Sequence, residues 1–457
     1  MRRRLVAWLA PIVLGHVGLV ALTASCSLLT DLSGLSGGPF ACKGGACTDG
    51  ATDDARGGEG GGPDAGPCVP TDTIAPSLLS DAVSLALGKG FSCALRTNGS
   101  VACWGENGDG VLAVQGGNRP TAGTLPGLSR IVAITAGNSF ACALDADGHV
   151  WCWGDNTFGQ LGSFAPNPGS HPPTMVMASD GKPLAGVTKI AAGDFHVCAI
   201  VSSAVWCWGA NDSFQLGRSP TNSAPAPIMT TLTEPSELAV AGKYSCVVAD
   251  DTVPSVRALY CWGNNDDNEL AYLGGNTATP QKIPVSLAPP GASPIVAAGH
   301  GHTCARDDKD ALRCWGENDF GQLGASVAPG SSPVPRTIDA LGMVRTAAAG
   351  DDFTCAVATD GTTRCLGENG AAQLGNGAVD TAPSDGGLSP PHTEATLVSG
   401  LPAASRIAAG TAHACAILAR SCPDVPGAVM CWGDNGSGAL GNGTTKATRV
   451  PVPVLTP

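Results

Sequence analysis

The strongest constraint on how this 457-residue chain can fold is a unit of about fifty residues that occurs seven times. Each unit contains a Val/Ile/Ala run ending in Gly, a run around a first Cys, an Asp-Gly or Asn-Gly turn, a second Cys in a Cys-Trp-Gly run, and a Pro-rich run. These runs have the composition of short β-strands separated by turns, and the Pro-rich run suits an edge strand. Four strands per unit and seven units predict an all-β fold, a seven-bladed β-propeller over residues 78–457.

The two ends of the repeat array predict how the ring closes. The array starts on the strand Val83–Leu87 and ends on the Pro-rich strand Val450–Val454. We expect the C-terminal segment to lie beside unit one, in the place that every other Pro-rich strand occupies before its following unit. Pairing of the N- and C-terminal segments would remove the exposed sheet edges that promote aggregation.

The repeat also resembles a known family. The pattern AAG-x-x-H-x-C-A followed by C-W-G-x-N-x-x-G-Q-L-G is similar to the repeat of the regulator of chromosome condensation family, which implies a seven-bladed propeller. This chain would be a disulfide-bearing variant among bacterial lipoproteins. Unit six departs from the pattern because Leu366 replaces the Trp, and unit four shortens Gly-x-x-aromatic to Gly242-Lys243-Tyr244. We expect those blades to be less regular.

The N-terminus has the features of an exported, anchored protein. Three Arg precede an apolar stretch, which predicts a signal peptide over residues 1–25. The junction Leu22-Thr23-Ala24-Ser25-Cys26 resembles the bacterial lipobox, which implies lipidation at Cys26, and Ser27 implies an outer-membrane location facing the periplasm or the surface. Residues 26–77 are rich in Gly, Asp and Pro and predict a flexible tether.

Cysteine spacing predicts a disulfide framework and therefore an oxidising compartment. Two Cys about ten residues apart on a hairpin lie opposite one another and can be joined. The seven expected pairs are Cys93–Cys103, Cys142–Cys152, Cys198–Cys207, Cys246–Cys261, Cys304–Cys314, Cys355–Cys365 and Cys415–Cys431. We expect Cys42 to pair with Cys47 and Cys68 with Cys422, the alternative being a bridge from Cys68 to Cys42 or Cys47.

Candidate catalytic chemistry is sparse. His196, His300, His302 and His413 are assigned to a slot that Phe fills in other units, and are therefore interpreted as packing residues. The Asn after each Trp-Gly is interpreted as fixing a turn. The oxygen-rich run Asn264–Glu269 lacks calcium-loop spacing and is interpreted as a solvated loop. We expect no catalytic set, no metal site and no cofactor.

Charge limits the partners. With 25 Lys and Arg against 38 Asp and Glu, the net charge is −13, which argues against binding to nucleic acid. The sequence favours a noncatalytic monomer that binds a protein or glycan at the cell envelope through propeller loops, held to the membrane by its lipid.

Two alternatives stay open: a guanine-nucleotide exchange activity, implied by the family resemblance, and a polysaccharide-cleaving propeller enzyme. The enzyme would need two convergent carboxylates, or a His/Tyr pair, in the central pocket, and no repeat-breaking pair is evident in the sequence. Function is assigned to the long loops after Gln-Leu-Gly, 163–173 and 376–392.

Overall fold

The structure is a computed structural model that describes residues 78–162, 169–219, 226–227, 232–251, 256–288, 295–325, 327–380, 391–419 and 427–457. The predicted signal peptide, the tether, Cys26, Cys42, Cys47, Cys68, Cys422 and most of the two long loops lie outside the described residues. In the part of the chain that is described, no helix has the length and apolar character needed to span a bilayer.

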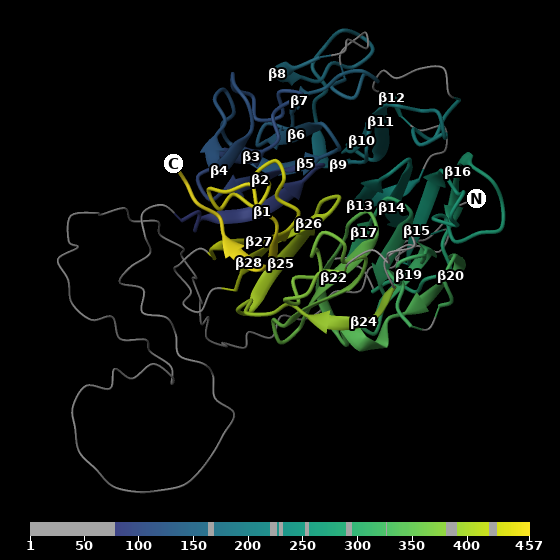
Figure 1. Ribbon diagram of the computed structural model, residues 1–457. Coiled ribbons are helices and arrows are strands. Elements are labelled where there is room, and N and C mark those ends of the chain that lie inside the picture. Colours follow the sequence, from purple (N-terminus) through teal and green to yellow (C-terminus); the bar gives the residue numbers. More distant parts are fainter. Residues whose placement is uncertain are drawn as a thin grey trace, which may run out of the picture. The chain divides into compact units, whose positions relative to one another are not determined.

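The chain forms seven four-stranded antiparallel sheets, each built from four consecutive strands (Figure 1). Blades one to four are β1 (Ala82–Leu87), β2 (Phe91–Arg96), β3 (Val101–Gly105), β4 (Arg119–Thr124); β5 (Ile131–Ala136), β6 (Phe140–Asp145), β7 (Val150–Gly154), β8 (His171–Met175); β9 (Val187–Ala192), β10 (His196–Val201), β11 (Ala204–Gly209), β12 (Ala226–Pro227); and β13 (Thr233–Ala241), β14 (Tyr244–Asp250), β15 (Arg257–Gly263), β16 (Thr277–Lys282).

Blades five to seven repeat the same order, with one 3-10 turn, η2 (Asp339–Leu341), in the link between blades five and six. Their strands are β17 (Val296–Ala298), β18 (His302–Arg306), β19 (Leu312–Glu317), β20 (Ser331–Thr337); β21 (Val344–Ala349), β22 (Phe353–Ala358), β23 (Thr363–Gly367), β24 (His392–Leu397); and β25 (Ala404–Ala409), β26 (His413–Leu418), β27 (Val429–Gly433), β28 (Thr448–Pro453).

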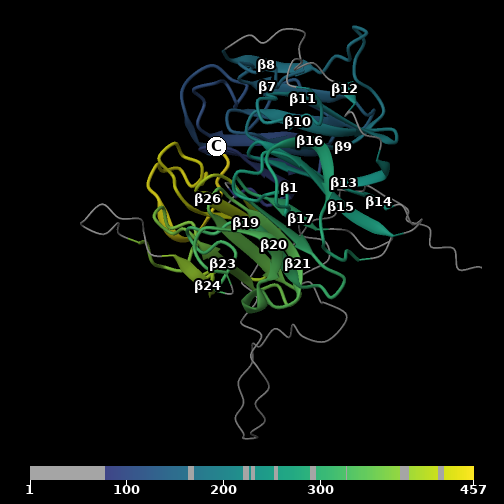
Figure 2. The ribbon, with the colours of Figure 1, turned by 90° about the vertical axis from the view of Figure 1, so that its right-hand side faces the viewer.

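The first strands of the seven blades contact one another in a ring, and residues from all seven line a central channel. In Figure 2, β1 and β17 lie near the middle of the propeller. Each first strand contacts the first strand of the next blade, and β25 contacts β1. The expected closure by the chain ends is confirmed: Leu78 bridges Leu455, and Leu79 N–H donates to the Val454 carbonyl at 3.0 Å. Within the continuous chain, Leu184 N–H donates to the Val176 carbonyl at 2.9 Å in the same way. The seam therefore reproduces an ordinary blade-to-blade link without the covalent connection.

The second and third strands of every blade pair so that two Cys face each other. Seven disulfides join the within-blade pairs named above, with Cα atoms 4.0–4.2 Å apart. All fourteen Cys are at most 1% exposed. Each disulfide thus links the two central strands of a blade inside its packed core.

The Trp of each Cys-Trp-Gly run joins neighbouring blades. In six blades its indole N–H donates to a backbone carbonyl in the Gln-Leu-Gly region of the preceding blade, at 2.7–3.0 Å. In blade six, Leu366 is fully buried in the equivalent place, and β22 and β23 keep the register of the other blades. The expectation of a less regular sixth blade is therefore wrong, because an apolar side chain fills the space.

Candidate binding face at the channel mouth

Seven glycines bring the blades into backbone contact at one end of the channel. A Cβ on Gly137 would lie 2.1 Å from Phe140 Cε1 and 2.5 Å from the carbonyl oxygen of Gly193 in the next blade. The same approach recurs around most of the ring, so only Gly fits there. The seven are Gly88, Gly137, Gly193, Gly242, Gly299, Gly350 and Gly410.

Two or three residues after each glycine, a large side chain is buried between blades. We call these seven positions the framework ring: Phe91, Phe140, His196, Tyr244, His302, Phe353 and His413. All are at most 1% exposed, and each pairs with the Gly of its blade's Trp-Gly or Leu-Gly. The framework ring is therefore a structural repeat.

The polar members of the framework ring bond to the next blade. The imidazole Nε2 atoms lie 2.8–2.9 Å from the hydroxyl oxygens of Ser245, Thr354 and Ser92. These hydroxyls donate to backbone carbonyls at 2.9 Å, so each imidazole donates from Nε2.

The side chain that faces each framework residue from the next blade matches it in polarity. After His196, Tyr244, His302 and His413, the facing position carries Ser or Thr, whereas after Phe91, Phe140 and Phe353 it carries Ala141, Val197 and Ala414. A polar group buried here has a partner, and an apolar one has an apolar neighbour. Burial lowers the pKa of His196, His302 and His413 to about 4 each. The packing interpretation of these three histidines is confirmed.

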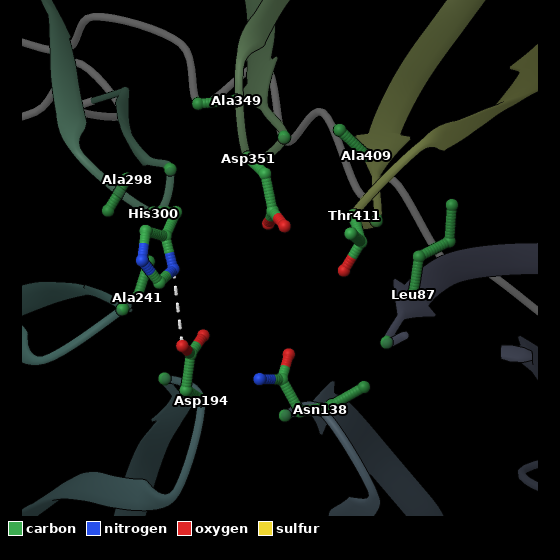
Figure 3. Close-up of a pocket in the computed structure, with 18 of the residues that line it drawn as sticks. Leu87, Asn138, Asp194, Ala241, Ala298, His300, Ala349, Asp351, Ala409 and Thr411 are labelled. Carbon is green, nitrogen blue, oxygen red and sulfur yellow. Dashed lines mark ion pairs between the residues drawn. The ribbon is translucent and has the colours of Figure 1, made fainter. Parts of the chain in front are cut away.

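The position directly after each glycine behaves differently. We call these seven residues the mouth ring: Lys89, Asn138, Asp194, Lys243, His300, Asp351 and Thr411. Figure 3 shows Asn138, Asp194, His300, Asp351 and Thr411 directed toward a common opening. These five residues, but not Lys89 or Lys243, line a cavity of about 160 Å³. A second cavity of about 290 Å³ shares its alanine-rich wall and is formed by the first strands. The mouth is polar and the channel wall is apolar.

His300 belongs to the mouth ring and not to the buried slot to which its sequence pattern assigned it. Its Nδ1 lies 3.2 Å from Asp194 Oδ2, and its side chain is about half exposed. The Asp194 carboxylate raises the pKa of His300 to about 9, against the opposing effect of burial. Because the buried slot is occupied by His302, the packing interpretation is wrong for His300.

Carboxylates crowd one side of the mouth. Burial raises the pKa of Glu317 to about 7, with further repulsion from Asp352 and Asp267. Burial likewise raises the pKa of Asp351 and of Asp352 to about 6, and neighbouring carboxylates add to both shifts while His300 opposes them. The free protein therefore holds more negative charge here than its own cations neutralise.

The loops after Trp-Gly belong to the same face. In all seven blades, the first N–H of this loop donates to the last carbonyl of the turn that carries the mouth residue, at 2.8–3.0 Å. We define the mouth face as the turns and the first four loop residues: 88–90, 106–109, 137–139, 155–158, 193–195, 210–213, 242–243, 264–267, 299–301, 317–320, 350–352, 368–371, 410–412 and 434–437.

The mouth face carries the propeller's entire charge excess. It contains thirteen Asp and Glu against two Lys, whereas the remainder of residues 78–457 contains eighteen acidic and eighteen basic side chains. An aromatic pair lies on the same face: the rings of Phe158 and Phe195 are 5.0 Å apart, and Phe158 is 45% exposed.

The repeated Asn in these loops is structural. In every blade its side-chain oxygen accepts the N–H five residues later, at 2.8–3.2 Å, as Asn107 does from Leu112. The turn-fixing interpretation is confirmed. The run Asn264–Glu269 is not a fully solvated loop, because Glu269 is 1% exposed and accepts a bond from Asn264 at 2.6 Å. Among the described residues, no group of three or more His, Cys, Asp or Glu could hold a metal ion.

Comparison with known proteins agrees with this geometry. Models of the regulator of chromosome condensation (RCC1) repeat match residues 82–111, 131–160, 187–215 and 295–322, and a second model of the same repeat matches 147–200 and 312–357. The chain is thus a seven-bladed propeller that contains RCC1 repeats in the matched segments.

Two curated relatives have similar sequences. The E3 ubiquitin-protein ligase HERC2 of Homo sapiens is 28% identical over 276 residues, 58% of this chain and 5% of the ligase. The ultraviolet-B receptor UVR8 of Arabidopsis thaliana is 27% identical over 271 residues, 58% of this chain and 57% of the receptor. The chain spans less than two thirds of the length of either relative.

Two solved structures share the fold. Prp20p from Saccharomyces cerevisiae, whose structure was described with its binding to Gsp1p and histones, is 21% identical with a TM-score of 0.64, covering 82% of this chain and 87% of its own. Human WBSCR16 is 20% identical with a TM-score of 0.61, and the match covers 73% of this chain and 85% of WBSCR16.

Proposed function

We propose that this protein is a noncatalytic recognition module that binds a partner protein across the mouth face. The observation that carries the proposal is the charge distribution: the excess of eleven acidic side chains is confined to loops that surround the channel mouth. A one-signed surface steers and selects partners and contributes little to fold. Protein binding is also what the description of Prp20p states for that propeller.

The contrast between the two rings supports binding at this face. The framework ring repeats because packing between blades requires it, whereas the residue after the glycine is cationic, anionic, amide or hydroxyl in different blades. Packing therefore does not dictate the mouth residues. An exposed aromatic ring beside charged groups, as at Phe158, is typical of interface anchors.

We further propose that the protein acts outside the cytoplasm, attached to the outer membrane through lipid on Cys26. The seven disulfides support an oxidising compartment. Mass spectrometry of the mature N-terminus tests the anchor, and an unmodified Cys26 or cleavage at another position would exclude it.

Crosslinking of the full chain in intact cells, followed by affinity capture, tests the function. We expect a partner that crosslinks to the mouth face and that is lost from the triple variant Asp194→Asn, Asp351→Asn, Asp352→Asn. The matched control removes three exposed carboxylates near the opposite end of the strands, through Glu234→Gln, Asp308→Asn and Asp339→Asn. Equal loss from both variants would exclude recognition by the mouth face.

Polysaccharide cleavage is the second candidate, because Asp194 and Asp351 converge at the mouth beside His300, a pair that the sequence argument did not find (Figure 3). The mouth cavity of about 160 Å³ is small beside the roughly 300–1,000 Å³ of typical ligand pockets. Release of reducing ends from neutral polysaccharides, abolished by Asp351→Asn, would favour the enzyme; no release favours recognition.

A further inference from the structure

We infer that the occupant of the mouth face is a basic segment of another protein, with one Lys or Arg side chain entering the channel mouth between Asp194, Asp351 and Asn138. This rests on the proposed function and names the chemistry of its partner.

Charge complementarity rules out the occupants that this chain could itself supply. The mouth face carries thirteen acidic side chains against two Lys. The tether, residues 26–77, has seven acidic side chains against one Lys and one Arg, so it would be repelled. A second copy would present either the same acidic face or the remainder of the propeller, which has no basic excess because its eighteen basic side chains are balanced by eighteen acidic ones. The negative electrostatic potential of the mouth face does not attract a neutral glycan, and it repels an anionic one. A basic segment of a different protein is the complementary ligand.

The mouth has room and chemistry for a single long cationic side chain. Carboxylate, amide and hydroxyl oxygens from Asp194, Asp351, Asn138 and Thr411 surround the opening (Figure 3). Beneath them the wall is formed largely by alanines, such as Ala298 and Ala349. Lys and Arg combine an apolar stem with a cationic end, and the stem can pack on alanine while the charge stays among the oxygens.

The channel mouth also lacks a full set of internal counter-ions. Asp194 is paired with His300, but among the described residues no cation lies within 4 Å of the Asp351 or Asp352 carboxylates. A cation from a partner would relieve the repulsion among these groups. Phe195, directly after Asp194, can add a ring face to an approaching cation.

Fluorescence anisotropy with the full chain tests the inference. The probes are a labelled Gly/Ser peptide containing several Lys and the same peptide with Gln in place of Lys. We expect only the Lys peptide to bind, with affinity that falls as salt rises from about 0.05 M to about 0.3 M. Asp351→Asn should weaken binding about fivefold, and Asp351→Glu should restore it. The control Asp308→Asn should leave binding within about twofold. Thermal unfolding verifies that each variant is folded.

The outcomes separate this inference from the proposed function. Equal binding of the Lys and Gln peptides, or equal loss in the Asp351→Asn and Asp308→Asn variants, would overturn the inference. So would free spermidine binding as tightly as the peptide, because the ligand would then be a small polyamine. A partner that crosslinks at the mouth face but is not displaced by the Lys peptide would preserve the function and refute a basic ligand. Absence of any mouth-face crosslink would refute the function itself.

Discussion

The framework ring and the mouth ring differ in role although their members are one or two residues apart in the chain. His302 is fully buried and bonds to Thr354 in the next blade, with its pKa lowered to about 4. His300 is half exposed and paired with Asp194, with its pKa raised to about 9. Two histidines of one Gly-His-Gly-His run thus have opposite electrostatics, because the repeat register places one between blades and the other at the channel.

This contrast gives a way to distinguish residues that serve packing from residues that are available for binding within a single repetitive chain. Positions that keep their character through seven blades, or that vary together with a contacting residue, serve packing. Positions that vary independently from blade to blade are free to serve binding. Variants that disturb only one of the two rings test that division.

Deleting Arg449–Pro457 should damage the framework most. The deletion removes all of β28 except Thr448, together with the fully buried Val454 and the Leu78–Leu455 bridge that closes the ring. We expect a loss of more than about 5 kcal/mol of unfolding free energy, in the range of exceptional effects, measured by urea unfolding with the disulfides intact. Deletion of the exposed Pro457 alone is the control, and unchanged stability of the longer truncation would disprove closure at this seam.

A methyl group in the glycine ring should cost about 3 kcal/mol. In Gly137→Ala the new Cβ meets Phe140 Cε1 at 2.1 Å and the Gly193 carbonyl at 2.5 Å. In the control Gly117→Ala nothing lies within 4 Å of the new atom. Differential scanning calorimetry should show a lower melting temperature for the first variant only; equal melting temperatures would mean that the blades can separate there without cost.

Acid should destabilise the framework ring. A buried histidine with a pKa of about 4 binds fewer protons when folded than when unfolded, at about 6.5. The contribution of each neutral histidine to the free energy of unfolding is therefore complete above pH 6.5. It is lost as pH falls toward 4, by up to about 3 kcal/mol for each histidine. The double variant His302→Phe, Thr354→Val copies the apolar pairing of other blades and should lose less stability between pH 7 and pH 4.5 than the wild type. An identical pH dependence would contradict the assignment.

Much of the fold could be predicted from the sequence because the residues that pack within and between blades recur in every unit. Seven blades, the seam and the turn-fixing Asn all follow from residues present in every unit. The mouth ring could not be found that way, because its residues do not repeat and one of them, His300, imitates the neighbouring packing histidine. Its signal was available in the residue after each repeat Gly. The Ser and Thr opposite each framework His were a second signal, since buried imidazoles need partners.

Binding of a basic segment should weaken in acid. Glu317 has a pKa of about 7, and Asp351 and Asp352 have pKa values of about 6, so all three lose negative charge as pH falls from 8 to 5. The pKa values of Asp267 and Glu368 are also raised by burial, and His300, with a pKa of about 9, stays mainly protonated over this range. We expect about tenfold lower affinity for the Lys peptide at pH 5 than at pH 8. Unchanged affinity would mean that these carboxylates do not contact the ligand.

The smallest change in affinity for the Lys peptide should come from His300→Gln. Its direction shows whether His300 competes with the ligand or contacts it. His300 is the mouth's own cation, so removing it frees Asp194 and increases the negative potential that attracts the partner's Lys or Arg. We expect about threefold tighter binding of the Lys peptide and almost no change in melting temperature, because the side chain is half exposed. His302→Gln should instead lower the melting temperature and leave the affinity of the folded fraction unchanged. Weaker binding by His300→Gln would show that the imidazole contacts the ligand and does not compete with it.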